Sequence, residues 1–351
     1  MKEKNGYRQW NTTILIKLGE RDMAERKIYH SIAELVGETP LVEVTNYEKE
    51  HELDATILAK LEYFNPSGSV KDRAALAMIQ DAEKRGKIKP GDTIMDFSSG
   101  NTGIALAAYA NALGYKFAVV LQPGVSEERT QILKAYGAIF LEFKDIPGVP
   151  ELIAEKGLAF DAFYDLLQKY ADEHGWYYIN QGRNPENPKV HIASTGPEIW
   201  EATGGNIDYL VALVGTGGSL IGIGKYLKEK NPDIQIVGAQ PAPESLKDPR
   251  YPERNTLDGV LTFDHVPEER VIRYFNEFEF EYDEVVEVNA DLAYEVGRDL
   301  VKTDGIFLGQ SAAAAIKVAT DIAKRPEAKG KTIVVICADN AFKYLSTNIY
   351  R

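Results

Sequence analysis

Short apolar runs, many of them rich in β-branched residues, alternate with longer segments of mixed polarity along the chain. Alternation of strand-like and helix-like segments is typical of α/β proteins. The interior runs are apolar at successive positions, which indicates parallel strands covered by helices on both faces. The sequence therefore predicts doubly wound sheets with the strands ATILAKLEY, TIMDF, KFAVVLQ, AIFLEF, WYYIN, DYLVALVG, QIVGAQ, VVEV and TIVVICA.

Two of the predicted helices begin inside polar turns. KDRAALAMIQDAEKRG is amphipathic and ends at Gly86, whereas NTGIALAAYANALG is more uniformly apolar and ends at Gly114. Glycine commonly follows a helix because it adopts the left-handed conformation without strain. We expect the second helix to be buried.

The chain of 351 residues is long enough for two lobes around a cleft, since domains usually hold roughly 100–200 residues. The sheet pattern lapses between residues 144 and 172, which indicates a crossing between lobes. We expect an extension at 1–28, an N-terminal lobe at 29–172, whose first strand could instead join the other sheet, and a C-terminal lobe at 173–351.

Composition narrows the function classes. The net charge of −13 disfavours binding to nucleic acid or to an anionic membrane, which needs clustered Lys and Arg. Cys337 is the only cysteine, so neither an intrachain disulfide nor a cysteine metal cluster can form, and its apolar surroundings predict a buried structural thiol. Because no apolar core of a signal peptide and no run of about 20 apolar residues is present, we expect a cytoplasmic protein that acts on a small molecule.

Three polar turns lie where α/β sheets place ligands, beyond the carboxyl ends of strands. In the first, NPSGSVKDRAA, Lys71 begins a helix. A lysine there is usually solvated, but the positive end of the helix dipole lowers the pKa of an amine, which favours Schiff-base chemistry.

The second turn, DFSSGNTG at residues 96–103, joins a strand to a helix. It is either a simple helix cap or an anion site in which hydroxyl, amide and backbone N–H groups converge on a carboxylate. The third, GTGGS at residues 215–219, suits a phosphate because glycines let the backbone wrap an oxyanion closely, although such turns are often only structural. It matches neither a Walker A loop nor GxGxxG.

In combination, NPSGSVKDRAA, SSGNTGIALA, NPENPKVHIASTGPEIW and GTGGSLIG resemble the cysteine synthase and cystathionine β-synthase family of fold-type II pyridoxal-phosphate enzymes. The resemblance covers about residues 29–347 and implies a two-lobed α/β fold like that of the tryptophan synthase β-subunit, the cofactor pyridoxal 5′-phosphate and a homodimer. The lysine motif reads SVKDRAA, unlike the SFKxRGA of the dehydratase branch.

The resemblance also assigns residues. Lys71 would bind the cofactor as an aldimine and then move the α-proton of the substrate. Asn101 would contact the cofactor's 3′-oxygen, and Ser311 its pyridine nitrogen, which a hydroxyl leaves neutral. The phosphate would lie on Gly215, Thr216, Gly217, Gly218 and Ser219. The substrate would contact Ser98, Ser99, Gly100, Thr102, Gln181 and Gly259.

Several positions depart from the family pattern. The usual GISSGAA becomes GQSAAAA, so that Ala312 and Ala313 follow Ser311. Gly182 replaces the aromatic residue that commonly follows the glutamine, and we expect it to widen the cleft. Asp258 replaces Gln or Glu before Gly259, and is either a turn residue or a catalytic carboxylate near the substrate. His191 has no partner histidine in an HxH or HExxH pattern, so we expect a structural histidine and no metal site.

The resemblance implies β-replacement through an α-aminoacrylate, as in a cysteine synthase that combines O-acetylserine or serine with sulfide or a thiol. An alternative is the catabolic direction, in which cysteine releases hydrogen sulfide and serine, lanthionine or cystathionine forms. A third hypothesis, a catalytically silent binding partner with the same fold, is disfavoured by the intact Lys71, Asn101 and GTGGS segments.

Overall fold

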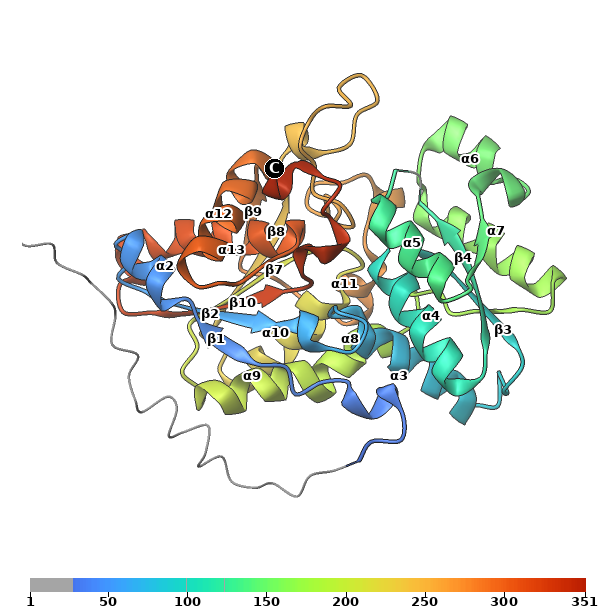
Figure 1. Cartoon of the computed structure of the whole chain (residues 1–351), viewed down its shortest axis with the longest axis horizontal. Coiled ribbons are helices and arrows are strands. Elements are labelled where there is room, and N and C mark those ends of the chain that lie inside the picture. Colours follow the sequence, from blue (N-terminus) through green and yellow to red (C-terminus); the bar gives the residue numbers. More distant parts are fainter. Residues whose placement is uncertain (1–27, 99, 123) are drawn as a thin grey trace, which may run out of the picture.

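The computed structural model describes residues 28–98, 100–122 and 124–351, so the expected extension at 1–28 lies almost wholly outside the described residues. Two sheets form the centres of two lobes (Figure 1). The strands are β1 (Leu41–Glu43), β2 (Thr56–Leu61), β3 (Thr93–Ser98), β4 (Lys116–Leu121), β5 (Ile139–Leu141), β6 (Tyr177–Tyr178), β7 (Tyr209–Leu213), β8 (Gln235–Pro241), β9 (Glu284–Val288) and β10 (Thr332–Cys337).

Helices connect most of these strands. They are α2 (Thr45–Glu50), α3 (Lys71–Lys84), α4 (Asn101–Leu113), α5 (Glu127–Ala135), α6 (Val149–Lys156), α7 (Phe160–Glu173), α8 (Glu186–Val190), α9 (Gly196–Thr203), α10 (Gly218–Lys230), α11 (Arg273–Glu277), α12 (Ala290–Thr303) and α13 (Gln310–Ala323), with a π-helical turn at His191–Thr195.

The larger sheet has the order β1-β2-β10-β7-β8-β9, and only β1 at its edge is antiparallel. Its two faces are covered by different helices. Apolar residues of α2, α12 and α13 pack on one face, and those of α9, α10 and α11 pack on the other. The predicted doubly wound arrangement is therefore confirmed for this lobe.

The smaller sheet has the parallel order β5-β4-β3-β6. The helices α3, α4 and α5 cover one face, and α6 and α7 cover the other. Because β6 pairs with β3, the expected lobe boundary at residue 172 falls before the last strand of this sheet. The strand β2 pairs with β10 in the larger sheet, so the chain enters the smaller lobe only after residue 61.

The two predicted helices near the polar turns are both present. Lys71 is the first residue of α3, and α4 ends at Gly114, whose φ of 85° is left-handed. Residues 102–110 of α4 are all buried, as expected from their uniform apolarity. The helix α4 follows β3 closely, whereas a 3₁₀ turn at Glu62–Phe64 and a loop separate α3 from β2. Both helices begin beyond the carboxyl end of the preceding strand.

The sequence predicted structural roles for Cys337 and His191. Cys337 is fully buried on β10, and this burial raises the pKa of its thiol. His191 is buried in the π-helical turn, where its Nδ1 lies 2.8 Å from Thr195 Oγ1. Both residues are buried within the fold, as expected of structural residues. Among the described residues, no helix combines the length and the apolarity needed to cross a bilayer.

Candidate active site

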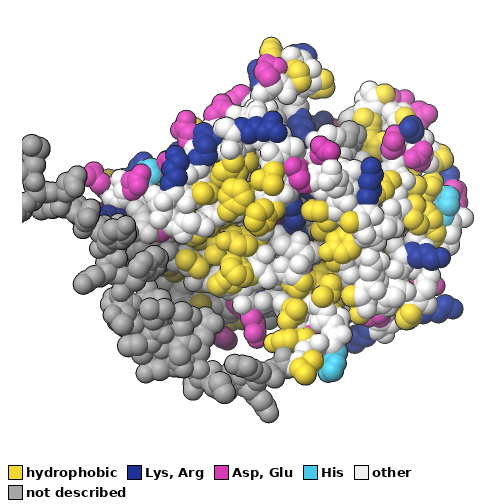
Figure 2. Space-filling view, in the orientation of Figure 1, with side chains coloured by type: hydrophobic (Ala, Val, Ile, Leu, Met, Phe, Trp, Pro, Cys, Tyr) yellow, Lys and Arg dark blue, Asp and Glu magenta, His cyan; other side chains and the backbone are white. Residues whose placement is uncertain are grey.

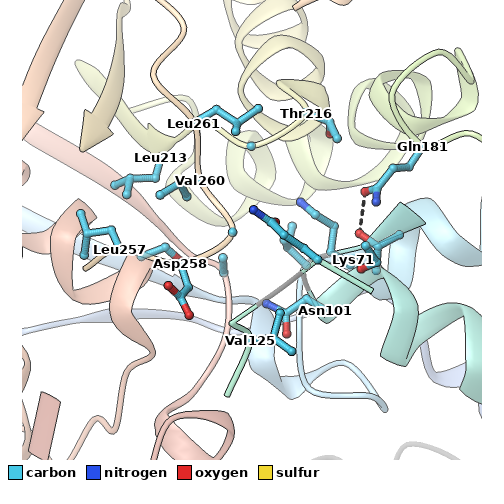
Figure 3. A pocket seen from close by; sticks show the side chains of 18 of the residues that line it. Lys71, Asn101, Val125, Gln181, Leu213, Thr216, Leu257, Asp258, Val260 and Leu261 are labelled. Carbon is cyan, nitrogen blue, oxygen red and sulfur yellow. Dashed lines mark hydrogen bonds between the residues drawn. The ribbon is translucent and has the colours of Figure 1, made fainter. Parts of the chain in front are cut away.

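A cavity of about 410 Å³ lies between the lobes, at the carboxyl ends of strands from both sheets. Figure 3 shows Lys71 extending into it between Asn101 and Thr216, which come from different lobes. All three polar turns of the sequence therefore meet on one cavity. The predicted site residues that line it are Lys71, Ser98, Asn101, Thr102, Gln181, Gly215, Thr216, Ser219, Asp258, Gly259 and Ser311.

The loop before Lys71 is fixed by the next residue. The buried carboxylate of Asp72 accepts hydrogen bonds from the Ser67 and Ser69 backbone N–H groups, at 2.7 and 3.2 Å, and from the Tyr109 hydroxyl at 2.6 Å. Lys71 thus projects from an anchored helix start. Desolvation lowers the pKa of its amine, partly offset by the negative charge of Asp339. A larger neutral fraction makes this amine a better nucleophile toward a carbonyl carbon.

The glycine loop connects β7 to α10. Gly217 has a left-handed φ of 86°, and a Cβ atom on Gly218 would lie 2.2 Å from Asn187 Oδ1, so both positions require glycine. Asn187 Nδ2 donates to Thr216 Oγ1 at 2.9 Å and so fixes that hydroxyl. The loop presents backbone N–H groups at the start of a helix, which is a favourable place for a phosphate.

The second turn brings Thr102 and Gln181 together. Thr102 Oγ1 donates to Gln181 Oε1 at 2.6 Å, the dashed bond at Gln181 in Figure 3. Gln181 Nε2 donates to the Phe97 carbonyl at 2.6 Å. Ser98 Oγ accepts from the N–H groups of Gly100 and Gly103, at 3.0 and 2.9 Å, and so caps the first turn of α4. Ser99 lies outside the described residues.

Asn101 contacts a residue that the sequence reasoning missed. Its Nδ2 donates to Asp339 Oδ2 at 2.8 Å, and the Tyr344 hydroxyl donates to the same oxygen at 2.6 Å. Asp339 is fully buried and follows β10 by two positions. A polar residue directly after the apolar run TIVVICA was the available signal, since strand ends carry ligand sites in α/β folds.

Asp258 is neither an isolated turn residue nor a free carboxylate. Its Oδ2 lies 2.6 Å from Arg129 Nη2 and its Oδ1 lies 3.0 Å from Lys247 Nζ. Arg129 is nearly fully buried on α5, whereas Lys247 is half exposed at the pocket. Neither cation was predicted, because a basic residue on a polar helix or loop carries no signal of an interlobe contact.

The expectation that Gly182 widens the cleft is wrong. A Cβ atom at this position would lie 2.3 Å from the Tyr164 hydroxyl and 2.5 Å from its Cζ. The ring of Tyr164, which comes from α7 and lines the cavity, therefore occupies the space that a side chain at position 182 would fill.

The side chains that line the cavity have the chemistry needed to hold a phosphorylated aldehyde cofactor. A partly desolvated amine on α3, a glycine loop at the start of α10 and a hydroxyl on α13 converge on it from Lys71, Thr216 and Ser311. In addition, Asn101 Oδ1 is buried with no hydrogen-bond partner among the described residues, as expected where a further polar group binds. The fold and this site define a pyridoxal-phosphate-dependent enzyme.

Comparison with known proteins gives the same class, a pyridoxal-phosphate-dependent enzyme. Residues 32–339 match the family model described as pyridoxal-phosphate dependent enzyme, and the chain belongs to this family. Its cofactor is pyridoxal 5′-phosphate, which Lys71 and the glycine loop would hold. When bound, the cofactor supplies an electron sink for chemistry at the carbons of an amino acid.

The proteins that this chain resembles include cysteine synthases. A cysteine synthase of Aquifex aeolicus is 41% identical over 338 residues, which cover 95% of this chain and 96% of that protein. A crystal structure of cysteine synthase from Entamoeba histolytica superposes with a TM-score of 0.75 at 36% identity and covers 94% of this chain and 93% of its own. A hydrogen sulfide-producing enzyme from Fusobacterium nucleatum gives a TM-score of 0.72 at 32% identity, with 91% and 99% covered.

Proposed function

We propose that this enzyme replaces the β-substituent of a small amino acid, with O-acetylserine or serine as first substrate and sulfide or a thiol as nucleophile. The observation that carries the proposal is the convergence of the Lys71 amine, the glycine loop and the Thr102–Gln181 pair on one cavity. Cysteine synthases with about 40% identity over nearly the whole chain support the same reaction.

The roles of the residues follow from their chemistry. The substrate carboxylate binds at the turn before α4, beside the Thr102–Gln181 pair, where N–H groups of the first helical turn can donate to it. Lys71 takes the α-proton, because its lowered pKa leaves a neutral amine that accepts one. The apolar side chains of Leu213, Leu257 and Val260 line the cavity and exclude water from the reacting carbons.

A second candidate is the release of hydrogen sulfide from cysteine. It is favoured by the Asp258 carboxylate on the cavity wall and by the similarity to the sulfide-producing Fusobacterium nucleatum enzyme. In this direction, water or a second amino acid adds to the β-carbon in place of the sulfide. The Asp258 carboxylate, held between Arg129 and Lys247, can orient this incoming group.

The two directions are separated by parallel assays on the purified holoenzyme. O-Acetylserine plus sulfide is assayed for cysteine, and cysteine alone or with homocysteine is assayed for sulfide. Faster cysteine formation supports the biosynthetic direction, and faster sulfide release supports the second candidate. If the holoenzyme converts none of these amino acids, both are wrong.

We also propose a homodimer in the cytoplasm. Exposed apolar side chains support the dimer: Phe342 and Leu345 are 63% and 51% exposed, and Phe342 packs on Phe307. Figure 2 shows hydrophobic side chains gathered on one face of the larger lobe. A second copy would cover such a surface. A monomeric mass by light scattering would contradict the dimer.

The cytoplasmic location is supported by Cys337. A lone, buried cysteine suits a reducing compartment.

A further inference from the structure

The contact between Tyr164 and Gly182 shapes the amino-acid side of the cavity. Gly182 directly follows Gln181, and a Cβ atom there would lie within 2.7 Å of three atoms of the Tyr164 ring and hydroxyl. The φ of Gly182 lies outside the left-handed region, so the glycine provides space and not an unusual backbone. Only glycine at position 182 lets Tyr164 occupy this wall.

Neighbouring side chains hold the ring of Tyr164 in place. Phe160 stacks on it with centroids 6.0 Å apart and planes 9° apart, and the Arg183 guanidinium lies 5.4 Å from the ring centroid. Arg183 is itself fixed by ion pairs of 2.7 Å to Asp161 and 2.6 Å to Asp165. The side chain is therefore positioned before any substrate arrives, which reduces the entropy cost of using it.

The hydroxyl of Tyr164 is a neutral donor. Burial raises the pKa of this phenol, so it keeps its proton at working pH. Within the described part of the chain this hydroxyl makes no hydrogen bond to another residue. The neighbouring Gln181 already uses both ends of its amide, on Thr102 and on the Phe97 carbonyl. Tyr164 is thus a donor on the cavity wall, in contact with the residue that follows Gln181, and the protein leaves it for a ligand.

We propose that Tyr164 is a specificity-determining residue that donates a hydrogen bond to the bound amino acid and limits the length of its β-substituent. The ring closes the side that Gly182 leaves open, beside Phe97 and Phe160, which also line the cavity. The inference rests on the proposed reaction at a small amino acid. It adds a residue to the site from α7, a helix that carries none of the polar turns.

The hydroxyl is tested by Tyr164→Phe, which keeps the ring. We expect the KM for O-acetylserine to rise about five- to tenfold, because one hydrogen bond to the substrate is lost. The kcat should change less than about twofold. Tyr170→Phe is the matched control, because Tyr170 lies on the same helix but packs on His174 outside the cavity. An unchanged KM in Tyr164→Phe would overturn the donor role.

The wall is tested by Tyr164→Ala, assayed with O-acetylserine and the longer O-succinylserine. We expect kcat/KM for the longer substrate, relative to the shorter one, to rise about tenfold or more. Adding Gly182→Phe to Tyr164→Ala rebuilds an aromatic wall from the neighbouring segment and should restore the original preference. If the ratio of kcat/KM for the two substrates is the same in wild type and Tyr164→Ala, Tyr164 does not limit the length of the β-substituent. Wild-type enzyme that converts no amino acid would instead contradict the proposed function.

Discussion

The Nδ2 atom of Asn101 lies 2.8 Å from Oδ2 of Asp339, a contact that joins the first residue of α4 in the smaller lobe to the end of β10 in the larger one. Asp339 also accepts the hydroxyl proton of Tyr344. One buried carboxylate therefore orients the amide that the resemblance places on the cofactor's 3′-oxygen, and it ties this amide to the neighbourhood of Lys71.

Asp339→Asn should weaken cofactor binding about tenfold. The substitution keeps the size of the side chain but removes the charged acceptor of Asn101, and hydrogen bonds to charged groups contribute about 1.5–3 kcal/mol. The measurement is an absorbance titration of cofactor-depleted protein with pyridoxal 5′-phosphate. Asp299→Asn, whose carboxylate is partly exposed on α12, is the matched control. Equal affinities of Asp339→Asn and wild type would show that Asp339 does not orient Asn101.

Asp258→Asn should reduce activity more with cysteine as first substrate than with O-acetylserine. If Asp258 orients the acceptor in the sulfide-releasing direction, its charge matters most there. Lys247→Gln is the second variant to measure, because it removes one cation beside Asp258 and leaves the 2.6 Å ion pair between Asp258 and the buried Arg129 intact. Steady-state kinetics with both substrates check the prediction. Equal losses would reduce Asp258 to a structural partner of Arg129.

Asp96 makes the stability of the protein depend on pH. It is fully buried on β3, burial raises its pKa to about 8, and its Oδ2 has no hydrogen-bond partner among the described residues. Between about pH 4 and pH 8 the folded protein keeps a proton that the unfolded chain has released. This contribution to stability is therefore complete at low pH and declines as the pH rises through the window, by at most about 1.4 kcal/mol per pH unit.

Asp96→Asn removes this titration. The free energy of unfolding of the variant, relative to wild type, should increase steadily from pH 5 to pH 8. Urea denaturation at several pH values measures it. A difference that does not change with pH would mean that Asp96 is ionised in the folded protein throughout this range.

Most of the fold could be predicted from the sequence because each apolar run becomes a strand. The nine predicted runs coincide with β2 to β10, since parallel strands buried on both faces leave a continuous apolar signal. The run around β1 was not assigned as a strand: Leu41–Glu43 is only three residues long and pairs antiparallel at the sheet edge. The two-residue β6 was predicted, but its sheet was not, because strand pairing is decided by tertiary packing.

The candidate site was predictable where it depends on local sequence. Lys71, Thr102 and the glycine loop lie at the starts of helices, and the turns that lead into these helices have recognisable composition. Arg129 and Tyr164 instead lie on α5 and α7. They reach the cavity through long-range packing, and in sequence they look like ordinary helical residues. The error at Gly182 has the same origin, because the residue that fills its space lies 18 positions earlier.

The role of Lys71 is tested most directly by locating the cofactor on the chain. Purified wild type and Lys71→Ala are reduced with borohydride, digested and examined by peptide mass spectrometry, with circular dichroism as the check on folding. We expect a pyridoxyl phosphate group on Lys71 in wild type. We expect no covalent cofactor in Lys71→Ala, which should fold normally and lose activity by about 100- to 10,000-fold. A label on another lysine, or full activity in Lys71→Ala, would contradict this role of Lys71.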